Sequence, residues 1–296
     1  MHDLNARNAV PLMARPLRLV PLGARRRVLH RLLIGQWPDM AQPRHYSEVA
    51  TRELHHESGV LAEVAGDKDL CKTYVRGLAA GVEVPRTRWI GTDVSTIPAS
   101  ALEGRWVAKF NAGSGMTVRG EGPGDHDELI RISKGWSKDV SAEMYGVTYY
   151  KHARHAVLIE DHIDGLAGRP LELRFFCFAG RTELVQMFHF TGDERSELYL
   201  DRNGARVDVS RILNRVTHTP AGDIRAVPAM YLQAREAAER LAGAFPHVRV
   251  DVYVAEGKVW FGELTPYPHG GMVRFAPDSF DRHLAQRWLD AIGSRR

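Results

Sequence analysis

The most informative segment of the sequence is Val107-Ala108-Lys109-Phe110-Asn111-Ala112-Gly113-Ser114-Gly115-Met116. Its apolar first half predicts a β-strand, and a glycine loop follows directly. Val118 continues in extended form, so we expect the loop to join two strands as a hairpin rather than to open a helix. The loop lacks the Gly-Lys-Ser/Thr ending of a Walker A motif, and it is not a Rossmann fingerprint. A plain hairpin turn is the alternative interpretation.

Lys109, just before this loop, indicates that the loop binds an anionic ligand. A lysine in an otherwise apolar strand is costly to bury unless an anionic partner accompanies it. The backbone N–H groups of the loop, together with the ammonium group of Lys109, would suit a polyphosphate. The sequence therefore indicates a candidate phosphate-binding segment at residues 109–116.

A second polar group lies late in the chain, in Arg249-Val250-Asp251 and Gly262-Glu263-Leu264-Thr265. A hairpin that turns at Glu256-Gly257 is expected to bring these two stretches together. Arg249 and Asp251 then share one strand face, and Glu263 lies on the partner strand. Two carboxylates on adjacent strands repel each other unless a cation lies between them, and oxygen ligands suit Mg²⁺. The alternative is a surface carboxylate pair with Arg249 as its salt-bridge partner.

The remaining elements predict a mixed architecture. Asp67 is a good N-cap for a helix that begins at Lys68. Residues 46–66 and 228–244 have helical periodicity, and a short apolar strand ends in Glu160. Residues 171–178 and 182–190 form a hairpin around Ala179-Gly180. Hairpins combined with helices predict an α+β (mixed α/β) fold rather than a doubly wound parallel sheet.

Composition excludes several classes of protein. The chain has 296 residues, of which 44% are hydrophobic and 26% charged, as is typical of globular proteins. No apolar run approaches the roughly 20 residues of a transmembrane segment, and no secretion signal is recognisable. Cys71 and Cys177 are too few for a disulfide framework, so we expect buried thiols and a cytoplasmic location. No set of histidines has the ligand count of a zinc site.

The net charge of +4 is unevenly distributed. No acidic residue occurs between Asp3 and Asp39, whereas seven arginines do: Arg7, Arg15, Arg18, Arg25, Arg26, Arg27 and Arg31. Three interpretations of this basic arm are open: a transit peptide, a patch for a membrane surface or an anionic ligand, and an ordinary solvated helix docked on the body. Nucleic-acid binding is not expected, because the arm lacks interleaved aromatic residues.

The order of these features resembles the ATP-grasp superfamily. It is most similar to the TupA-like group, which is associated with teichuronopeptide and other cell-surface polysaccharide biosynthesis. The resemblance runs from about Val28 to Phe280. Besides the stretches quoted above, it rests on Gly35-Gln36-Trp37-Pro38, Gly66-Asp67-Lys68, Arg174-Phe175-Phe176-Cys177-Phe178-Ala179-Gly180 and Val248-Arg249-Val250-Asp251-Val252-Tyr253.

The resemblance implies an ATP-grasp fold, in which a nucleotide is held between two α+β subdomains, with an N-terminal helical arm. The implied divisions are the arm at 1–45, an N-terminal subdomain at 46–100, the small ATP-grasp subdomain at 101–165 and the large subdomain at 166–296. The residues implied to bind ATP are Lys68 and Lys109 on the phosphates, Gly113, Ser114, Gly115 and Met116 closing over them, Glu160, Asp161, His162 and Ile163 around adenine, and Glu172 on the ribose. The residues implied at the reacting centre are the Mg²⁺ ligands Asp251 and Glu263, with Arg249 near an acyl phosphate.

The implied activity is an ATP-dependent ligase that joins a carboxylate to an amine. Thr265 departs from the family pattern, since many ATP-grasp enzymes have a metal-binding Asn there, and the count of one or two Mg²⁺ stays open. Pro266 and the stretch Tyr267-Pro268-His269-Gly270-Gly271 also vary the segment expected to border the acceptor. Two other functions stay open: a kinase of the same fold that phosphorylates a glycan or small molecule, and a non-catalytic nucleotide-binding protein.

Overall fold

The structure is a computed structural model that describes residues 20–54, 59–138, 145–164, 170–191, 194–220 and 229–295. Four helices come first: α1 (Leu22–Leu33), α2 (Tyr46–Glu53), α3 (Val60–Gly66) and α4 (Lys68–Gly77). The helical periodicity of residues 46–66 thus corresponds to two helices, α2 and α3. Asp67 caps α4 as predicted, because its side chain accepts hydrogen bonds from the backbone N–H groups of Asp69 and Leu70.

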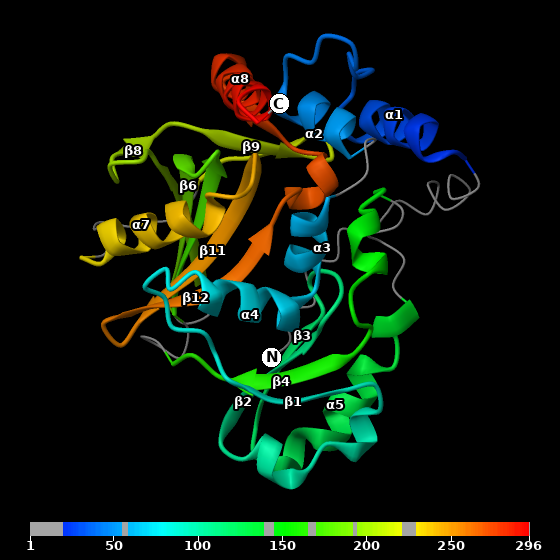
Figure 1. The fold of residues 1–296 in the computed structure, drawn as a ribbon, viewed down its shortest axis with the longest axis vertical. Helices are drawn as coiled ribbons and strands as arrows, with labels where there is room; N and C mark the ends of the chain where they lie inside the picture. The colour runs from blue at the N-terminus through cyan, green and yellow to red at the C-terminus, as the bar shows by residue number, and fades with distance from the viewer. Residues whose placement is uncertain are drawn as a thin grey trace.

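A four-stranded antiparallel sheet forms the lower part of the molecule (Figure 1). Its strands, in the order β1-β4-β2-β3, are β1 (Thr87–Gly91), β4 (Val157–Asp161), β2 (Arg105–Phe110) and β3 (Thr117–Glu121). The glycine loop joins β2 to β3 as a hairpin, as predicted. Trp106 and α5 (His126–Ser133), through Leu129, fill the core on one face of this sheet. β1 precedes residue 100 but pairs with β4 in this sheet. The boundary between subdomains at residue 100 stays a prediction.

A six-stranded antiparallel sheet forms the larger part. Its order is β12-β11-β5-β6-β7-β8. The strands are β5 (Leu171–Phe178), β6 (Arg181–Thr191), β7 (Glu194–Leu200), β8 (Arg206–Val207), β11 (His247–Ala255) and β12 (Lys258–Thr265). The two hairpins predicted from glycine turns, β5–β6 and β11–β12, are both confirmed.

Helices cover both faces of the large sheet. On one face, α7 (Tyr231–Ala242) packs Ala238 and Leu241 against β11, and the buried side of α4 joins the same core. On the other face, α2 and α8 (Asp278–Gly293) enclose a second core in which Trp288 and Tyr46 contact His247. A small sheet in the order β10-β9-β13 completes the fold, from β9 (Ser210–Leu213), β10 (Val216–His218) and β13 (Arg274–Ala276). The architecture is therefore the predicted mixture of helices and antiparallel sheets.

Short 3₁₀ segments connect these elements, at Val94–Thr96, Ala99–Leu102, Pro123–Asp125, Trp136–Lys138, Thr148–Lys151 and Pro268–Gly271. α3 and α4 lie between the two main sheets (Figure 1), so residues on the first turns of α4 can face both. This position of α4 determines where the candidate site forms.

The part of the basic arm that the structure describes packs on the body of the protein. Arg26, in α1, is fully buried and donates hydrogen bonds to the carbonyl groups of Tyr145 and Gly270 and to the Thr51 hydroxyl. Burial lowers the pKa of Arg26 to about 9. The docked-helix interpretation therefore fits residues 22–33, whereas Arg7, Arg15 and Arg18 lie outside the described residues. Among the described helices, none combines the length and the apolar character needed to cross a membrane.

Candidate active site

The start of α4 is tied to the glycine loop. Lys68 Nζ donates to the carbonyl oxygen of Gly113 at 2.5 Å and lies 3.5 Å from that of Asn111. The Asp67 carboxylate also accepts from the backbone N–H of Arg154, and Asp67 forms an isolated β-bridge with Ala112. These contacts bring the ammonium group of Lys68 beside the loop that was predicted to cover phosphates.

The loop itself needs glycine. Gly113 and Gly115 have φ values of 101° and 76°, in the region that other residues rarely adopt. A Cβ atom on Gly113 would also lie 2.8 Å from Cε of Met116. Ser114 and Gly115 form an exposed tip, so the loop has space to move over a ligand.

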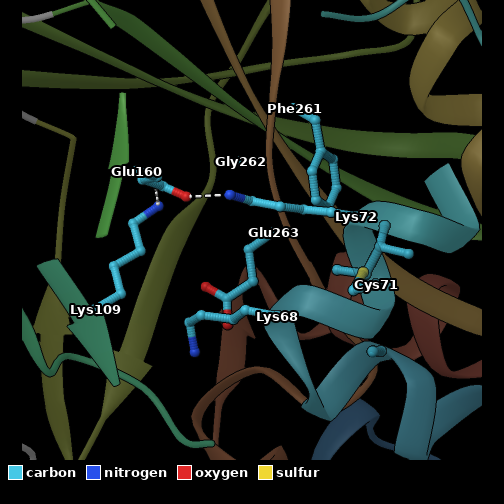
Figure 2. A pocket seen from close by; sticks show the side chains of 10 residues that line it. Lys68, Cys71, Lys72, Lys109, Glu160, Phe261, Gly262 and Glu263 are labelled. Carbon is cyan, nitrogen blue, oxygen red and sulfur yellow. Dashed lines mark ion pairs between the residues drawn. The ribbon is translucent and has the colours of Figure 1, made fainter. Parts of the chain in front are cut away.

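Three charged side chains meet beside this loop (Figure 2). Glu160, at the end of β4, forms ion pairs with Lys109 of β2 at 2.5 Å and with Lys72 of α4 at 2.6 Å. Lys72 also donates to the Thr87 hydroxyl at 3.1 Å. Burial opposes ionisation of Glu160, but Lys109 and Lys72 outweigh it and lower the pKa of this carboxyl group.

Lys72 was not predicted from the sequence. A signal was present, because Lys68 and Lys72 are four residues apart and therefore lie on the same face of α4. The sequence could not tell that Glu160, nearly ninety positions later, would lie opposite that face.

A pocket lies between α4 and the strands β2, β4 and β12. It is lined by Ala65, Lys68, Cys71, Lys72, Lys109, Glu160, Phe261, Gly262, Glu263 and Leu264. Three ammonium groups and two carboxylates thus face one pocket, an excess of one positive charge. Burial lowers the pKa of Lys68, and Lys109 lowers it further, although Glu263 opposes the shift. An anionic ligand would relieve this crowding of positive charge, so the pocket fits a polyphosphate.

The two predicted metal-binding carboxylates lie opposite each other. Asp251 of β11 pairs directly with Glu263 of β12, so both side chains project from the same face of the sheet. A β-bulge follows Asp251, and a Cβ atom on Gly262 would lie 2.8 Å from the Asp251 carbonyl oxygen. Gly262 therefore permits the close approach of β12 to β11 beside these carboxylates.

Arg249 and Asp251 form a buried bidentate ion pair. Nε of Arg249 contacts Oδ1 of Asp251, and Nη2 contacts Oδ2, both at 2.6 Å. Nη2 also donates to the Thr265 hydroxyl at 3.3 Å. Arg174, on β5, is a second cation at 3.6 Å from Asp251. Burial raises the pKa of Asp251 to about 6, although Arg249 and Arg174 oppose the rise.

This arrangement fits Mg²⁺. A carboxylate has about four lone-pair positions, so the two hydrogen bonds from Arg249 leave acceptor capacity on Asp251. Among the described residues, no group of three or more His, Cys, Asp or Glu side chains could hold a metal ion. Asp251 and Glu263 match an ion that takes its other ligands from water and phosphate oxygens, as Mg²⁺ commonly does.

The other predicted nucleotide-binding residues lie outside the pocket lining. The Asp161 side chain accepts from Arg88 at 2.5 Å, and its backbone N–H donates to the Arg86 carbonyl. His162 contacts Asp164, and Ile163 is partly exposed. Glu172, on β5, pairs with Arg174 at 2.7 Å. The predicted adenine segment therefore continues from Glu160 past the end of β4 in the small sheet, whereas Glu172 belongs to the large one.

The chain was compared with known protein families, curated proteins and solved structures. The sequence model of the TupA-like ATP-grasp family matches residues 51–289. No curated protein matches the chain at a significant level. Among solved structures, the D-alanine–D-alanine ligase of Bacillus anthracis is 15% identical with a TM-score of 0.50, over 84% of this chain and 70% of the ligase.

Two further solved structures are more distant. The ATP-grasp ligase PsnB, complexed with its minimal precursor, is 13% identical with a TM-score of 0.39, over 75% of this chain and 60% of PsnB. The N5-carboxyaminoimidazole synthetase of Staphylococcus aureus is 11% identical with a TM-score of 0.41, over 69% of this chain and 44% of the synthetase. This chain thus spans less than two thirds of the length of either protein. Because the family match extends over residues 51–289 and the fold is that of an ATP-grasp protein, the chain belongs to the TupA-like ATP-grasp family.

Proposed function

We propose that the protein is an ATP-dependent ligase that activates a carboxylate as an acyl phosphate and joins it to an amine. The observation that carries this proposal is the convergence of Lys68, Lys109 and Glu160 on one pocket that Glu263 also lines. Membership of the ATP-grasp family supports it.

ATP would bind with its phosphates at the glycine loop. Lys68 and Lys109 would neutralise phosphate charge, and the exposed tip of the loop, at Ser114 and Gly115, would close over them. Glu160 and the backbone of residues 161–163 would receive adenine, and Glu172 the ribose. Closure of the loop would exclude water, which protects an acyl phosphate from hydrolysis.

Asp251 and Glu263 would hold Mg²⁺, which neutralises the charge that develops during phosphoryl transfer. An oxygen of the substrate carboxylate attacks the γ-phosphorus, ADP leaves, and an acyl phosphate forms. The amine then attacks the acyl carbon, and inorganic phosphate leaves as the amide forms and the amine loses a proton.

Arg249 would stabilise the oxyanion of the second step. It lies two residues before Asp251, on the same strand face, and its guanidinium group is held by Asp251 and Thr265. A donor that is fixed in position before reaction stabilises developing charge without reorganisation. This preorganisation favours a ligase, since a kinase forms no oxyanion on carbon.

The same proposal covers the setting of the reaction. The TupA-like family suggests polysaccharide or natural-product biosynthesis. Cys71 and Cys177 are both buried free thiols, which fits a cytoplasmic protein.

Hydroxylamine trapping tests the reaction type. The protein is incubated with ATP, Mg²⁺ and hydroxylamine against a panel of amino acids, uronic acids and carboxylated natural products. A ligase should form a hydroxamate from its carboxylate, with one ADP released per product, and product mass identifies the compound. A stable phosphate ester with no hydroxamate would instead establish a kinase and contradict the proposed ligation.

A further inference from the structure

Glu160 is engaged on both of its carboxylate oxygens. Oε1 lies 2.5 Å from Nζ of Lys109, and Oε2 lies 2.6 Å from Nζ of Lys72 (Figure 2). The proposed function requires two other contacts from this cluster. Lys109 must contact phosphate, and one oxygen of Glu160 must accept a hydrogen bond from the amino group of adenine. Both requirements are met at once if Lys109 leaves Oε1 for the phosphates.

Lys109 and Lys72 differ in how firmly they are held. The Lys109 side chain is 19% exposed, on a strand that ends at the glycine loop. The Lys72 side chain is only 5% exposed, and it extends from α4 past Phe261 toward Glu160. Its hydrogen bond to Thr87 fixes the same ammonium group a second time. Lys109 is therefore the partner that can move, and Lys72 is the partner that stays.

Without Lys72, the departure of Lys109 would leave Glu160 almost without compensating charge. The Glu160 side chain is 3% exposed, so water cannot solvate it effectively. A buried carboxylate that loses its ion-pair partner takes up a proton or becomes strongly destabilising. A protonated Glu160 would present a hydrogen-bond donor on one of its oxygens, and it would no longer select an amino group over a carbonyl group.

We propose that Lys72 is a positioning residue for nucleotide recognition: it keeps Glu160 ionised and oriented toward the base when Lys109 exchanges Glu160 for the phosphates. Lys72 then acts chiefly on base selectivity, and it affects phosphate affinity only through the cost of freeing Lys109 from Glu160. This inference rests on the proposed ATP site but not on the ligation step. ATP carries an amino group at purine position 6, whereas GTP carries a carbonyl oxygen there, which an ionised Glu160 repels.

The test measures three ligands in the presence of Mg²⁺: ATP, GTP and inorganic tripolyphosphate. Isothermal titration calorimetry gives the Kd of each for wild type, Lys72→Met, Lys109→Met and the control Lys258→Met. Lys258 is an exposed lysine on β12 that pairs only loosely with Glu83, at 3.7 Å. Methionine keeps the length of lysine and removes its charge.

We expect Lys72→Met to weaken ATP binding about 10- to 100-fold, the range for loss of a hydrogen bond to a charged group. Its Kd values for GTP and tripolyphosphate should rise clearly less than its Kd for ATP, because these ligands share only the cost of freeing Lys109 from Glu160, so that most of the preference for ATP over GTP is lost. Lys109→Met should weaken all three ligands, and Lys258→Met should weaken none. Lys72→Arg should keep most of the ATP preference, since it retains the charge.

Two results would overturn the inference. If Lys72→Met weakens tripolyphosphate as much as ATP, Lys72 is a third phosphate ligand. If the variant keeps wild-type affinity for ATP, Lys72 has no role in binding.

If Lys72→Met fails to fold, the cause would be the buried charge of Glu160, which has then lost one of its two partners. The double variant Lys72→Met/Glu160→Gln removes that charge. It should fold, bind tripolyphosphate normally and lose the ATP preference; retention of that preference would overturn the inference as well. A wild-type protein that binds ATP selectively but forms no hydroxamate would count against ligation alone. A wild-type protein that binds no ATP would overturn both.

Discussion

Replacing Arg249 with Met tests whether the buried ion pair with Asp251 organises the reacting centre. Arg249 and Asp251 are 8% and 4% exposed, and two hydrogen bonds of 2.6 Å join them. The substitution removes both bonds and a third contact to Thr265. The Asp251 carboxylate would then have Arg174, at 3.6 Å, as its nearest remaining cation among the described residues.

Removal of one partner from a buried ion pair costs about 3–5 kcal/mol. We expect about 3 kcal/mol for Arg249→Met, at the lower end, because Arg174 continues to offset the charge of Asp251. Asp251→Asn should cost about 2 kcal/mol, because the amide oxygen can still accept a bond from Arg249. The double variant has no unpaired charge in this pair and should cost only about 2 kcal/mol, so the coupling energy should be about 3 kcal/mol.

Urea unfolding of the four proteins, followed by far-ultraviolet circular dichroism at pH 7.5 without nucleotide, measures these free energies. A coupling energy below about 0.5 kcal/mol would refute the reasoning, since contacting residues that act together should exceed that value. In the same preparations, Arg249→Met should slow the chemical step more than it raises the KM for ATP. A raised KM with unchanged kcat would show that Arg249 serves binding and not the oxyanion.

Mg-ATP at 100 times its Kd should stabilise the protein by about 2.7 kcal/mol, and thermal unfolding with and without EDTA would show it; no shift at millimolar nucleotide would contradict the ATP site. Burial, together with Arg249, lowers the pKa of His247 to about 3. Below its unfolded pKa of about 6.5, His247 takes up a proton in the unfolded chain but not in the folded protein, so the stability present above pH 6.5 is lost as the pH falls toward 3. Wild type should therefore lose about 2 kcal/mol more than His247→Gln between pH 7 and pH 5, and equal losses in urea titrations would contradict this. Gly271→Ala should destabilise the protein by about 2–3 kcal/mol, because the φ of Gly271 is 77° and the new Cβ would lie 2.5 Å from Cβ of Ala50. The control Gly257→Ala, at a φ of 68° with no close neighbour, should cost only about 1 kcal/mol. Similar losses of stability in both variants would refute the steric argument.

Features determined by local chemistry were predictable from the sequence. The turns at Ala179-Gly180 and Glu256-Gly257 both use left-handed backbone, with φ values of 46°, 79°, 53° and 68°. Glycine at the second position signals such a turn, so both hairpins could be located in advance. Once the second hairpin was located, strand alternation was enough to predict that Arg249 and Asp251 share a face.

Features that depend on long-range packing were not predictable. Burial of Arg26 in α1 depends on carbonyl groups of Tyr145 and Gly270, which are distant in sequence. A run of arginines without acidic neighbours indicates solvent exposure or an anionic partner, and only tertiary structure shows that backbone carbonyl groups can serve instead. The contact of Lys72 with Glu160 was missed for the same reason, because Lys72 lies on the helix α4 and Glu160 on the distant strand β4.

The proposed site is built from charges that already have partners within the chain. Lys68 donates to Gly113, Lys109 pairs with Glu160, and Asp251 pairs with Arg249. Binding of Mg-ATP would therefore exchange one set of ion pairs for another, so the affinity is the difference between two large terms. Such an exchange lets the protein fold without carrying uncompensated buried charge, and it lets a single ligand reorganise several groups together. This exchange is the reason for the role proposed for Lys72. When Lys109 moves from Glu160 to the phosphates, a cation that does not move is needed to hold the orientation of the Glu160 carboxylate.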